Sequence, residues 1–587
     1  MAQPKGPPGF VLPEQTQAGN SSFLTSPKRL EQWVKGLPRA HIGETSRHVY
    51  HALSELNQFP LGAEQRLTAL EALAEPIDYV VNSLRKHVLG QAFPLTPKKQ
   101  KVSQLIREIL HEAAVGYRIY LENVVTAPQG RIVGPATVAA VERALHYGLL
   151  LLFNAYQTYA PPPKGAWMGL HKLYAFAAQH GLHELPTNQA PGSGRDTIED
   201  TYKRILLLAL VNPYQLSQDD IQRIYDSLYF WAPYCALTPM TPRTSSRSMF
   251  AVNPESDDPP AYYAYCTVES RQCLLLDTRA LVQQVRELVA NGNALAYPPA
   301  ITQLPRDALK RMLLSWGSLS KRSFTRRGNS AQVKVTLGLS GTYKFLVGRS
   351  KPAAQSSSPS RATFSSQLVR AADGNGLYPG VWDLNDSNAV PSIYDQARGK
   401  SASKTPPNFV FANTGANETS MAFNITNESA GGYCLLWKQS TSGALLVGDM
   451  VCIHDSKTNH CNICVIRWMK NVSDKMVLGV EILSPCAQPT TVRIIHGDGA
   501  RGDPTESLLL PPVSAVKRPI TLLTAPTLRG GDVLALDTPE GTRMIRLTHL
   551  QQSTRSFKQF QFADVEVTAS TESEEEGPGF DNIWSSL

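Results

Sequence analysis

The sequence predicts a multidomain α+β protein, with an N-terminal α-helical, repeat-like domain, then a small β-barrel, then a second small β-rich domain. Three observations support this order. The 587 residues are enough for about three domains of the usual ~100 to 200 residues. Apolar residues recur at spacings of three and four in the first half of the chain and alternate in much of the second half. A hydrophobic content of 42% with 18% charged residues is typical of folded globular proteins.

Charge, cysteine content and apolar runs indicate which partners and which compartment to expect. The 57 basic and 49 acidic side chains give a net charge of +8, a mild bias that does not by itself indicate binding to DNA or RNA. The eight cysteines are sparse and the N-terminus carries no apolar segment typical of a signal peptide, so we expect a reduced, cytoplasmic protein. The longest apolar run, Gly148–Phe153, is far shorter than the ~20 residues of a membrane helix, so we expect no membrane span.

The helical domain is predicted over residues 27–317, after a Pro-, Gly-, Gln- and Ser-rich segment, 1–26, that is expected to be disordered. Amphipathic helices are indicated by two apolar stripes flanked by charges: Leu67, Leu70, Leu73, Ile77, Val80, Val81 and Leu84, and then Leu105, Ile109, Ala113 and Tyr117. Further helices are predicted over Ile198–Leu210 and from Ser217, the predicted N-cap, to Trp231.

Paired helices without strands favour a helical-repeat scaffold whose surface binds another protein. A single irregular bundle with no partner fits the same pattern. Residues 236–262 are rich in Pro, Ser, Thr and Asp and are predicted to form a long loop with one short strand at Met249–Val252. Helices over 278–290 and 304–316 then complete the domain.

The first barrel is predicted over residues 318–487. Alternation in 332–339 indicates a first strand, and the segment 432–484 reads as three or four more. Between them, 350–408 is rich in Ser, Ala, Asn and Pro and is expected to be a mobile insertion. Such an insertion costs little, because loop-closure entropy grows only by ~0.6 kcal/mol per doubling of length.

The second β-rich domain is predicted over residues 488–567, with Val533–Leu536 and Met544–Leu547 forming a hairpin around a turn at Pro539–Gly541. An acidic tail, 568–587, follows. Four apolar tail residues are spaced as one helical face: Phe580, Ile583, Trp584 and Leu587. This spacing is typical of a docking peptide for a groove on a partner or on the helical domain, although a disordered tail would also fit.

Two short motifs point to a ligand. Arg322 and Arg326 form an RxxxR motif, with Arg327 directly after it, and Asn427-Glu-Ser-Ala-Gly-Gly432 forms NxSxxG. Arginine stays charged, binds phosphate or the guanine edge through two parallel hydrogen bonds, and stacks on bases. The asparagine amide and serine hydroxyl can also meet a guanine edge, and glycine permits close backbone approach. Seen singly, the first motif is more often a solvated basic linker and the second only a turn.

The two motifs in this order, followed by Val465–Lys470 and Val477–Leu483 as strands, resemble the PilZ domain. The resemblance implies a receptor for cyclic di-GMP, whose two phosphodiesters and two guanines need the donors just described. The binding residues that it implies are Arg322, Arg326, Arg327, Asn427, Ser429 and Gly432. One departure concerns spacing, since the residues between Arg326 and Asn427 outnumber those usual in the family.

The resemblance also implies outputs such as motility, surface attachment or type IV pilus function, exerted by a cytoplasmic receptor recruited to a membrane-associated or polar complex. A large helical region before a late PilZ barrel is similar in layout to the FimW-type receptors. The helical domain would then relay the ligand signal to a protein partner.

Other functions fit the sequence less well. The barrel could be a ligand-free packing module in a scaffold protein. RNA binding needs several exposed aromatic residues among basic ones, and only Tyr343, Phe345 and Trp468 are candidates. We find no nucleophile elbow, catalytic carboxylate pair or zinc helix, so we predict no enzyme and no cofactor. Cys461 and Cys464 lack a second pair at metal-ligand spacing, so we expect them to be surface and core sulfurs.

Overall fold

The computed structural model describes residues 9–16, 26–127, 132–187, 196–240, 249–263, 273–291, 297–317, 325–350, 420–438, 445–454, 461–472, 475–496, 500–512 and 518–565. Four predictions therefore lie wholly or mostly outside the described residues. They concern the segment 1–26 apart from 9–16 and 26, Arg322, the predicted insertion beyond its first residue, and the acidic tail with its four apolar residues.

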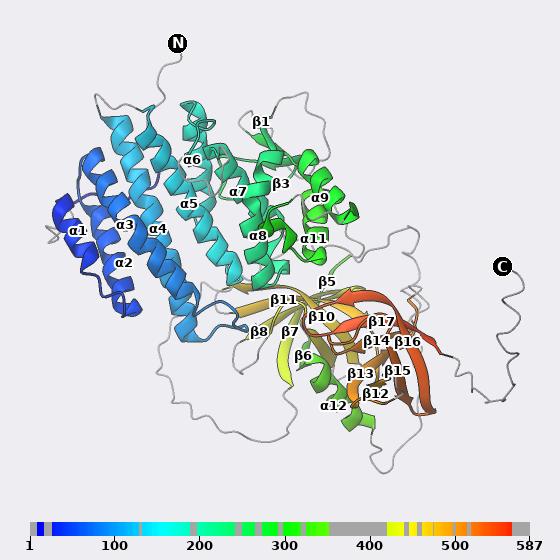
Figure 1. Ribbon diagram of the computed structural model, residues 1–587. Helices are drawn as coiled ribbons and strands as arrows, with labels where there is room; N and C mark the ends of the chain where they lie inside the picture. The colour runs from blue at the N-terminus through cyan, green and yellow to red at the C-terminus, as the bar shows by residue number, and fades with distance from the viewer. Residues whose placement is uncertain are drawn as a thin grey trace, which may run out of the picture.

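The helices of the N-terminal half lie side by side in one array (Figure 1). The apolar stripes and the Ser217 N-cap are confirmed, since the Ser217 side chain accepts a hydrogen bond from the backbone N–H of Asp220. The elements are α1 (Pro27–Lys35), α2 (Ile42–Gln58), α3 (Ala63–Arg85), α4 (Pro97–Thr126), α5 (Pro135–Gln157), α6 (Ala166–Gln179), α7 (Ile198–Leu210), η1 (Pro213–Gln215), α8 (Gln218–Trp231) and η2 (Ala232–Tyr234).

Helix α5 is the most apolar element of this array. Among the described helices, it alone is long and apolar enough to cross a membrane by length and composition. However, 72% of its apolar window is buried inside the protein, where the helix packs against α4, α6, α7 and α8. Such burial is what the core helix of a globular domain shows, because its apolar faces are covered by neighbouring helices rather than by lipid.

A small antiparallel sheet follows the array, in the order β1-β4-β2-β3. The sequence analysis predicted only β2 of these strands, because the others are short and their pairing joins distant segments. The strands are β1 (Ala236–Pro239), β2 (Met249–Val252), β3 (Ala261–Tyr262) and β4 (Leu274–Asp277), and the helices after them are α9 (Arg279–Asn291), α10 (Pro299–Thr302) and α11 (Arg306–Gly317). The buried Trp316 fixes α11 on the array, since its indole N–H donates to the carbonyl of Leu207 over 3.2 Å.

The predicted first barrel is confirmed. Its sheet runs β5-β7-β6-β9-β10-β11-β8, and the additional pairing of β7 with β8 closes six of these strands into a ring. The strands are β5 (Arg327–Gly328), β6 (Gln332–Leu337), β7 (Met421–Ser429), β8 (Gly432–Lys438), β9 (Met450–His454), β10 (Cys461–Val472) and β11 (Lys475–Ser484). Helix α12 (Gly338–Ser350) was not predicted, and it begins at a glycine with a φ of +71° that ends β6.

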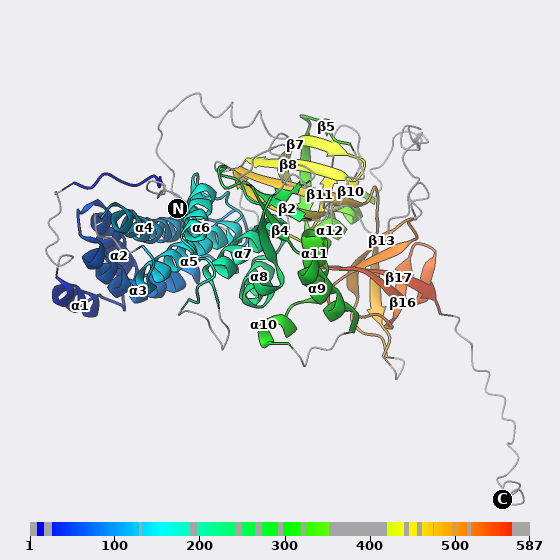
Figure 2. The ribbon, with the colours of Figure 1, turned by 90° about the horizontal axis from the view of Figure 1, so that it is seen from above.

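The second β-rich segment is also a closed barrel, in the order β12-β13-β14-β17-β16-β15. The predicted hairpin is present, with Thr538 paired to Gly541 at its turn. The strands are β12 (Gln488–Ile494), β13 (Thr505–Leu510), β14 (Thr521–Thr524), β15 (Val533–Thr538), β16 (Gly541–Ser553) and β17 (Lys558–Asp564). Both barrels lie at the end of the helical array that carries α8 and α11, as the two views show (Figures 1 and 2).

The first barrel is attached to the helical array by strand β10 and the loop before β9. The backbone N–H of Asn471 donates to the carbonyl of Tyr159 over 2.7 Å, and the Lys470 ammonium lies 5.3 Å from the ring centre of Tyr214. A β-bridge joins Phe93 to Leu445. Because a continuous apolar cluster also spans both parts, the array and the barrel share one core.

Candidate ligand-binding site

The structure brings the arginine segment beside the NxSxxG motif. Strand β5 pairs antiparallel with β7, so that Arg327 lies opposite Glu428 and Gly328 lies opposite Asn427. The side-chain amide of Asn329 donates to Glu428 over 2.8 Å and fixes this pairing. Two segments that are far apart in sequence therefore form one short ribbon at the end of the barrel.

A β-bulge in strand β7 turns the motif to the outside of the barrel. Ile425 pairs with Leu435, and both are buried in the core, whereas the next pair in the register is Asn427 with Cys434. Thr426 is thus the extra residue. Since side chains alternate between the faces of a strand, one extra residue reverses the alternation beyond it. Asn427 and the residue two positions on, Ser429, consequently lie on the outer face.

Alternation also separates the two neighbouring arginines. Extending the β5–β7 register by one residue puts Arg326 opposite Ser429, on the outer face, while Arg327 shares the other face with Glu428. Electrostatics agree with this placement. Burial raises the pKa of the Cys434 thiol, whereas the side-chain hydrogen bond of Thr426 and the positive charge of Arg326 lower it, as expected for an arginine on the side of the strand that carries this thiol. The outer face therefore gathers Arg326, Asn427 and Ser429.

Gly432 has a structural reason to be glycine. It pairs with Ser429 across the β7–β8 turn and with Glu481 of β11. A Cβ at this position would lie 1.9 Å from the backbone oxygen of Val480. The last residue of NxSxxG therefore allows β8 to lie close to β11 and holds the turn, and its identity alone says nothing about a ligand.

An ion pair that the sequence analysis missed lies next to this turn. Arg467 Nε is 2.5 Å from Glu481 Oε2, and Arg467 Nη2 donates over 3.2 Å to Gln552 of the second barrel. On the helical side, Arg311 of α11 donates to the carbonyl of Gln215 over 2.6 Å. Burial lowers the pKa of Arg311, and the positive charge of Arg467 acts in the same direction. Element η1, which contains Gln215, packs on β10, the strand that carries Arg467. The helical array and both barrels thus meet beside the NxSxxG turn.

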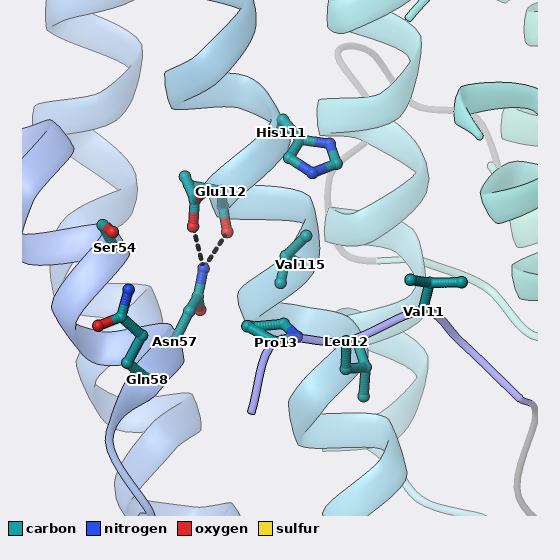
Figure 3. A pocket seen from close by; sticks show the side chains of 9 residues that line it. All are labelled: Val11, Leu12, Pro13, Ser54, Asn57, Gln58, His111, Glu112 and Val115. Carbon is teal, nitrogen blue, oxygen red and sulfur yellow. Dashed lines mark hydrogen bonds between the residues drawn. The ribbon is translucent and has the colours of Figure 1, made fainter. Parts of the chain in front are cut away.

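A cavity of about 330 Å³ lies elsewhere, on the helical array (Figure 3). Its walls come from α2, α4 and residues 11–13, with the Asn57 amide donating to Glu112 Oε2 over 2.8 Å. The described residues 9–16 are extended and attached to the array, since the Lys172 ammonium donates to the Gly9 carbonyl. They depart from the disorder expected of 1–26, because Phe10 packs against the apolar core and the backbone N–H of Thr16 donates to the carbonyl of Gln58 over 2.9 Å. No predicted binding residue lines this cavity.

The described cysteines differ in their exposure. Among the described residues, no group of three His, Cys, Asp or Glu side chains is placed to hold a metal ion. Cys464 is fully buried in the barrel core, whereas Cys461 is partly exposed. The prediction of one core and one surface sulfur is confirmed.

A closed six-stranded barrel with an arginine next to an NxSxxG turn is the arrangement expected of a PilZ-domain protein. Three family models match the chain: "Cyclic-di-GMP receptor FimW, N-terminal domain" over residues 28–243, its "middle PilZ domain" over 249–489, and "FimW C-terminal beta-barrel domain" over 490–565. The chain therefore belongs to the FimW family. The middle-domain match begins at 249, so it includes β2 to β4 and α9 to α11, which the sequence analysis grouped with the helical domain.

Whole-chain comparison agrees with the family models. The chain is 29% identical to the cyclic-di-GMP receptor FimW of Pseudomonas aeruginosa strain PAO1, over 98% of this chain and 98% of that protein. No solved structure matches.

Proposed function

We propose that this protein is a cytoplasmic cyclic di-GMP receptor and that it binds the dinucleotide on the outer face of its first barrel. Membership of the FimW family supports the receptor class. The observation that carries the residue assignment is the β5–β7 pairing, which sets Arg326 beside Asn427 and Ser429 on one face. Arg322 completes the proposed site, Gly432 holds its turn, and Arg327, on the other face of the ribbon, contributes less.

The chemistry of these groups suits the ligand. The Arg326 guanidinium offers parallel N–H donors to a phosphodiester or to the O6 and N7 acceptors of guanine. The Asn427 amide has both donors and an acceptor, and the Ser429 hydroxyl can donate or accept. Because Asn427 and Ser429 belong to the paired strand β7 and Arg326 directly precedes β5, their backbone is positioned before the ligand arrives, which reduces the entropy lost on binding.

Isothermal titration calorimetry on the full chain tests the proposal directly. We expect saturable binding of cyclic di-GMP with micromolar or tighter affinity, and no comparable heat with the two control ligands. GTP carries one guanine and no phosphodiester, and cyclic AMP carries one phosphodiester and no guanine. Folded protein that takes up no cyclic di-GMP would reject the receptor assignment in favour of a scaffold with a ligand-free barrel.

We further propose that ligand binding is relayed to the helical array and from there to a protein partner, with motility, surface attachment or type IV pili as the output. Helix α11 precedes the arginine segment in the sequence, and Arg311 of α11 donates to Gln215 of η1, which packs on β10, the strand of the Arg467–Glu481 pair. A ligand that binds the arginine segment would therefore also act on the position of α11.

Hydrogen–deuterium exchange with and without cyclic di-GMP measures this relay. We expect slower amide exchange in β5 and β7, where the ligand binds, and also in α11 and η1, because Arg311 ties these two elements together. Protection confined to the barrel strands would show that the ligand leaves the helical array unchanged and would reject the relay. Protein without ligand but with GTP is the matched control.

A further inference from the structure

Two cysteines lie side by side on strands β9 and β10, away from the proposed ligand face. The register pairs Cys461 with His454 and Cys452 with Ile463. Cys452 is two residues from His454, so both thiols lie on the same face of the sheet, diagonally across the two strands. Their side chains share a hydrogen bond.

An arginine of α12 completes this thiol pair. Arg349 donates a hydrogen bond from Nη1 to Cys461 Sγ. Its guanidinium carbon lies 5.6 Å from the ring centre of Phe345, which in turn contacts the His454 ring at 5.5 Å. The hydrogen bond from Cys452 lowers the pKa of Cys461, and the charge of Arg349 acts in the same direction. Cys461 therefore has the electropositive, partly exposed surroundings of a reactive thiol.

Cys486 and Cys464 do not combine partial exposure with a lowered thiol pKa, as Cys461 does. Cys486 is more exposed, yet burial raises the pKa of its thiol. Cys464 is fully buried on the core face, where burial raises its pKa well above the usual value. If exposure alone decided reactivity, Cys486 would react first, whereas thiolate stabilisation favours Cys461.

We propose that Cys461 and Cys452 form a peroxide-sensitive dithiol site in which Cys461 is the attacking sulfur and Cys452 the resolving one. The Cys461 thiolate attacks one oxygen of a hydroperoxide, the O–O bond breaks, and the leaving oxygen departs as hydroxide or alkoxide. Cys461 becomes a sulfenic acid, oxidised by two electrons, and the peroxide is reduced by two.

In the second step, Cys452 gives its proton to the leaving hydroxide or alkoxide, and its sulfur attacks Cys461 Sγ. The S–OH bond breaks, hydroxide leaves and is protonated to water by solvent, and the Cys452–Cys461 disulfide forms. Cys461 is the first residue of β10, so the end of the strand can adjust as the sulfurs approach. Cys452 is fully buried, so the peroxide must reach Cys461 first.

The site is placed to affect how the domains pack. Cys452 belongs to an apolar cluster that joins the first barrel to residues of the second, including Leu508 and Phe557, and Leu346 of α12 packs in the same cluster. A disulfide that shifts the start of β10 would change the packing of side chains at this junction. The inference does not rest on the proposed ligand, because none of its residues belongs to the proposed binding face.

Hydrogen peroxide added to the reduced full-length protein tests the inference, with each thiol followed by alkylation and peptide mass spectrometry. We expect Cys461 to be consumed about tenfold faster than Cys486, because the larger thiolate fraction of Cys461 outweighs the lower nucleophilicity of a thiolate with a lower pKa. We also expect a disulfide-linked peptide that joins Cys452 to Cys461. In denaturant the two rates should become equal. Equal or faster loss of Cys486 in the folded protein would overturn the proposal, as would oxidised Cys461 without the disulfide.

Two variants separate the roles of the residues. In Cys452→Ser, we expect the sulfenic acid on Cys461 to persist and to be trapped by dimedone, because the resolving thiol is absent. In Arg349→Gln, we expect Cys461 to react several-fold more slowly, while Cys486 keeps its rate. An Arg349→Gln protein with unchanged Cys461 reactivity would remove the arginine from the site.

Discussion

Arg326→Ala is expected to weaken cyclic di-GMP binding about tenfold to a hundredfold, because it removes charge-assisted hydrogen bonds worth roughly 1.5 to 3 kcal/mol. Arg326 lies opposite Ser429 on the outer face of the β5–β7 ribbon, where its guanidinium would meet a phosphate or a guanine edge. The side chain is partly exposed and lies outside the strand assignments, so the free energy of unfolding should barely change. Calorimetry measures the affinity, and thermal unfolding checks that the variant is folded.

Arg327→Ala is the matched control, since it removes the same charge one residue further along. Arg327 lies opposite Glu428 on the other face of the ribbon, so we expect an affinity close to that of the wild type. An equal loss in both variants would mean that the two arginines both contact ligand, as they would around a stacked pair of dinucleotides. Wild-type affinity in both variants would reject the site.

Much of the fold could be predicted from the sequence where the interactions are local. The helices follow from apolar spacing, and the Ser217 cap follows from its place before Asp219 and Asp220, because these signals act within one or two turns. The hairpin around Gly541 was likewise visible as two alternating runs joined by a short turn.

The elements that were not predicted from the sequence depend on contacts between distant segments. Helix α12 has little amphipathic pattern of its own, and its position is set by packing against both barrels. The small sheet β1-β4-β2-β3 joins short strands from separated segments. In both places, tertiary contacts outweigh local propensity.

In the candidate site, too, local features could be predicted from the sequence and features set by long-range contacts could not. The two motifs could be found in the sequence, because they are made of unusual residue types at fixed spacing. Which arginine faces outward could not, because that depends on the β5–β7 register and on the bulge at Thr426. The Arg467–Glu481 pair was not predicted either, because its residues come from two strands and its further partner, Gln552, comes from the second barrel.

Gly432→Ala is expected to lower the free energy of unfolding by about 3 kcal/mol, at the upper end of what overpacking usually costs. The new methyl group would lie 1.9 Å from the Val480 oxygen and 3.0 Å from its carbonyl carbon. Both are backbone atoms in the middle of β11, so no side chain can rotate out of the way. Strand β8 must then move away from β11 where Gly432 pairs with Glu481, which weakens the closure of the barrel.

Gly328→Ala is the control within the same sheet. Nothing lies within 4 Å of a Cβ at this position, and its φ is outside the left-handed region, so we expect a change in stability within about 0.5 kcal/mol. Chemical denaturation of both variants gives the comparison. If Gly432→Ala were as stable as Gly328→Ala and yet lost cyclic di-GMP, the glycine would serve close approach of the ligand. If Gly432→Ala loses stability as expected, its loss of ligand follows from a displaced turn, and Asn427 and Ser429 remain the proposed ligand contacts on that turn.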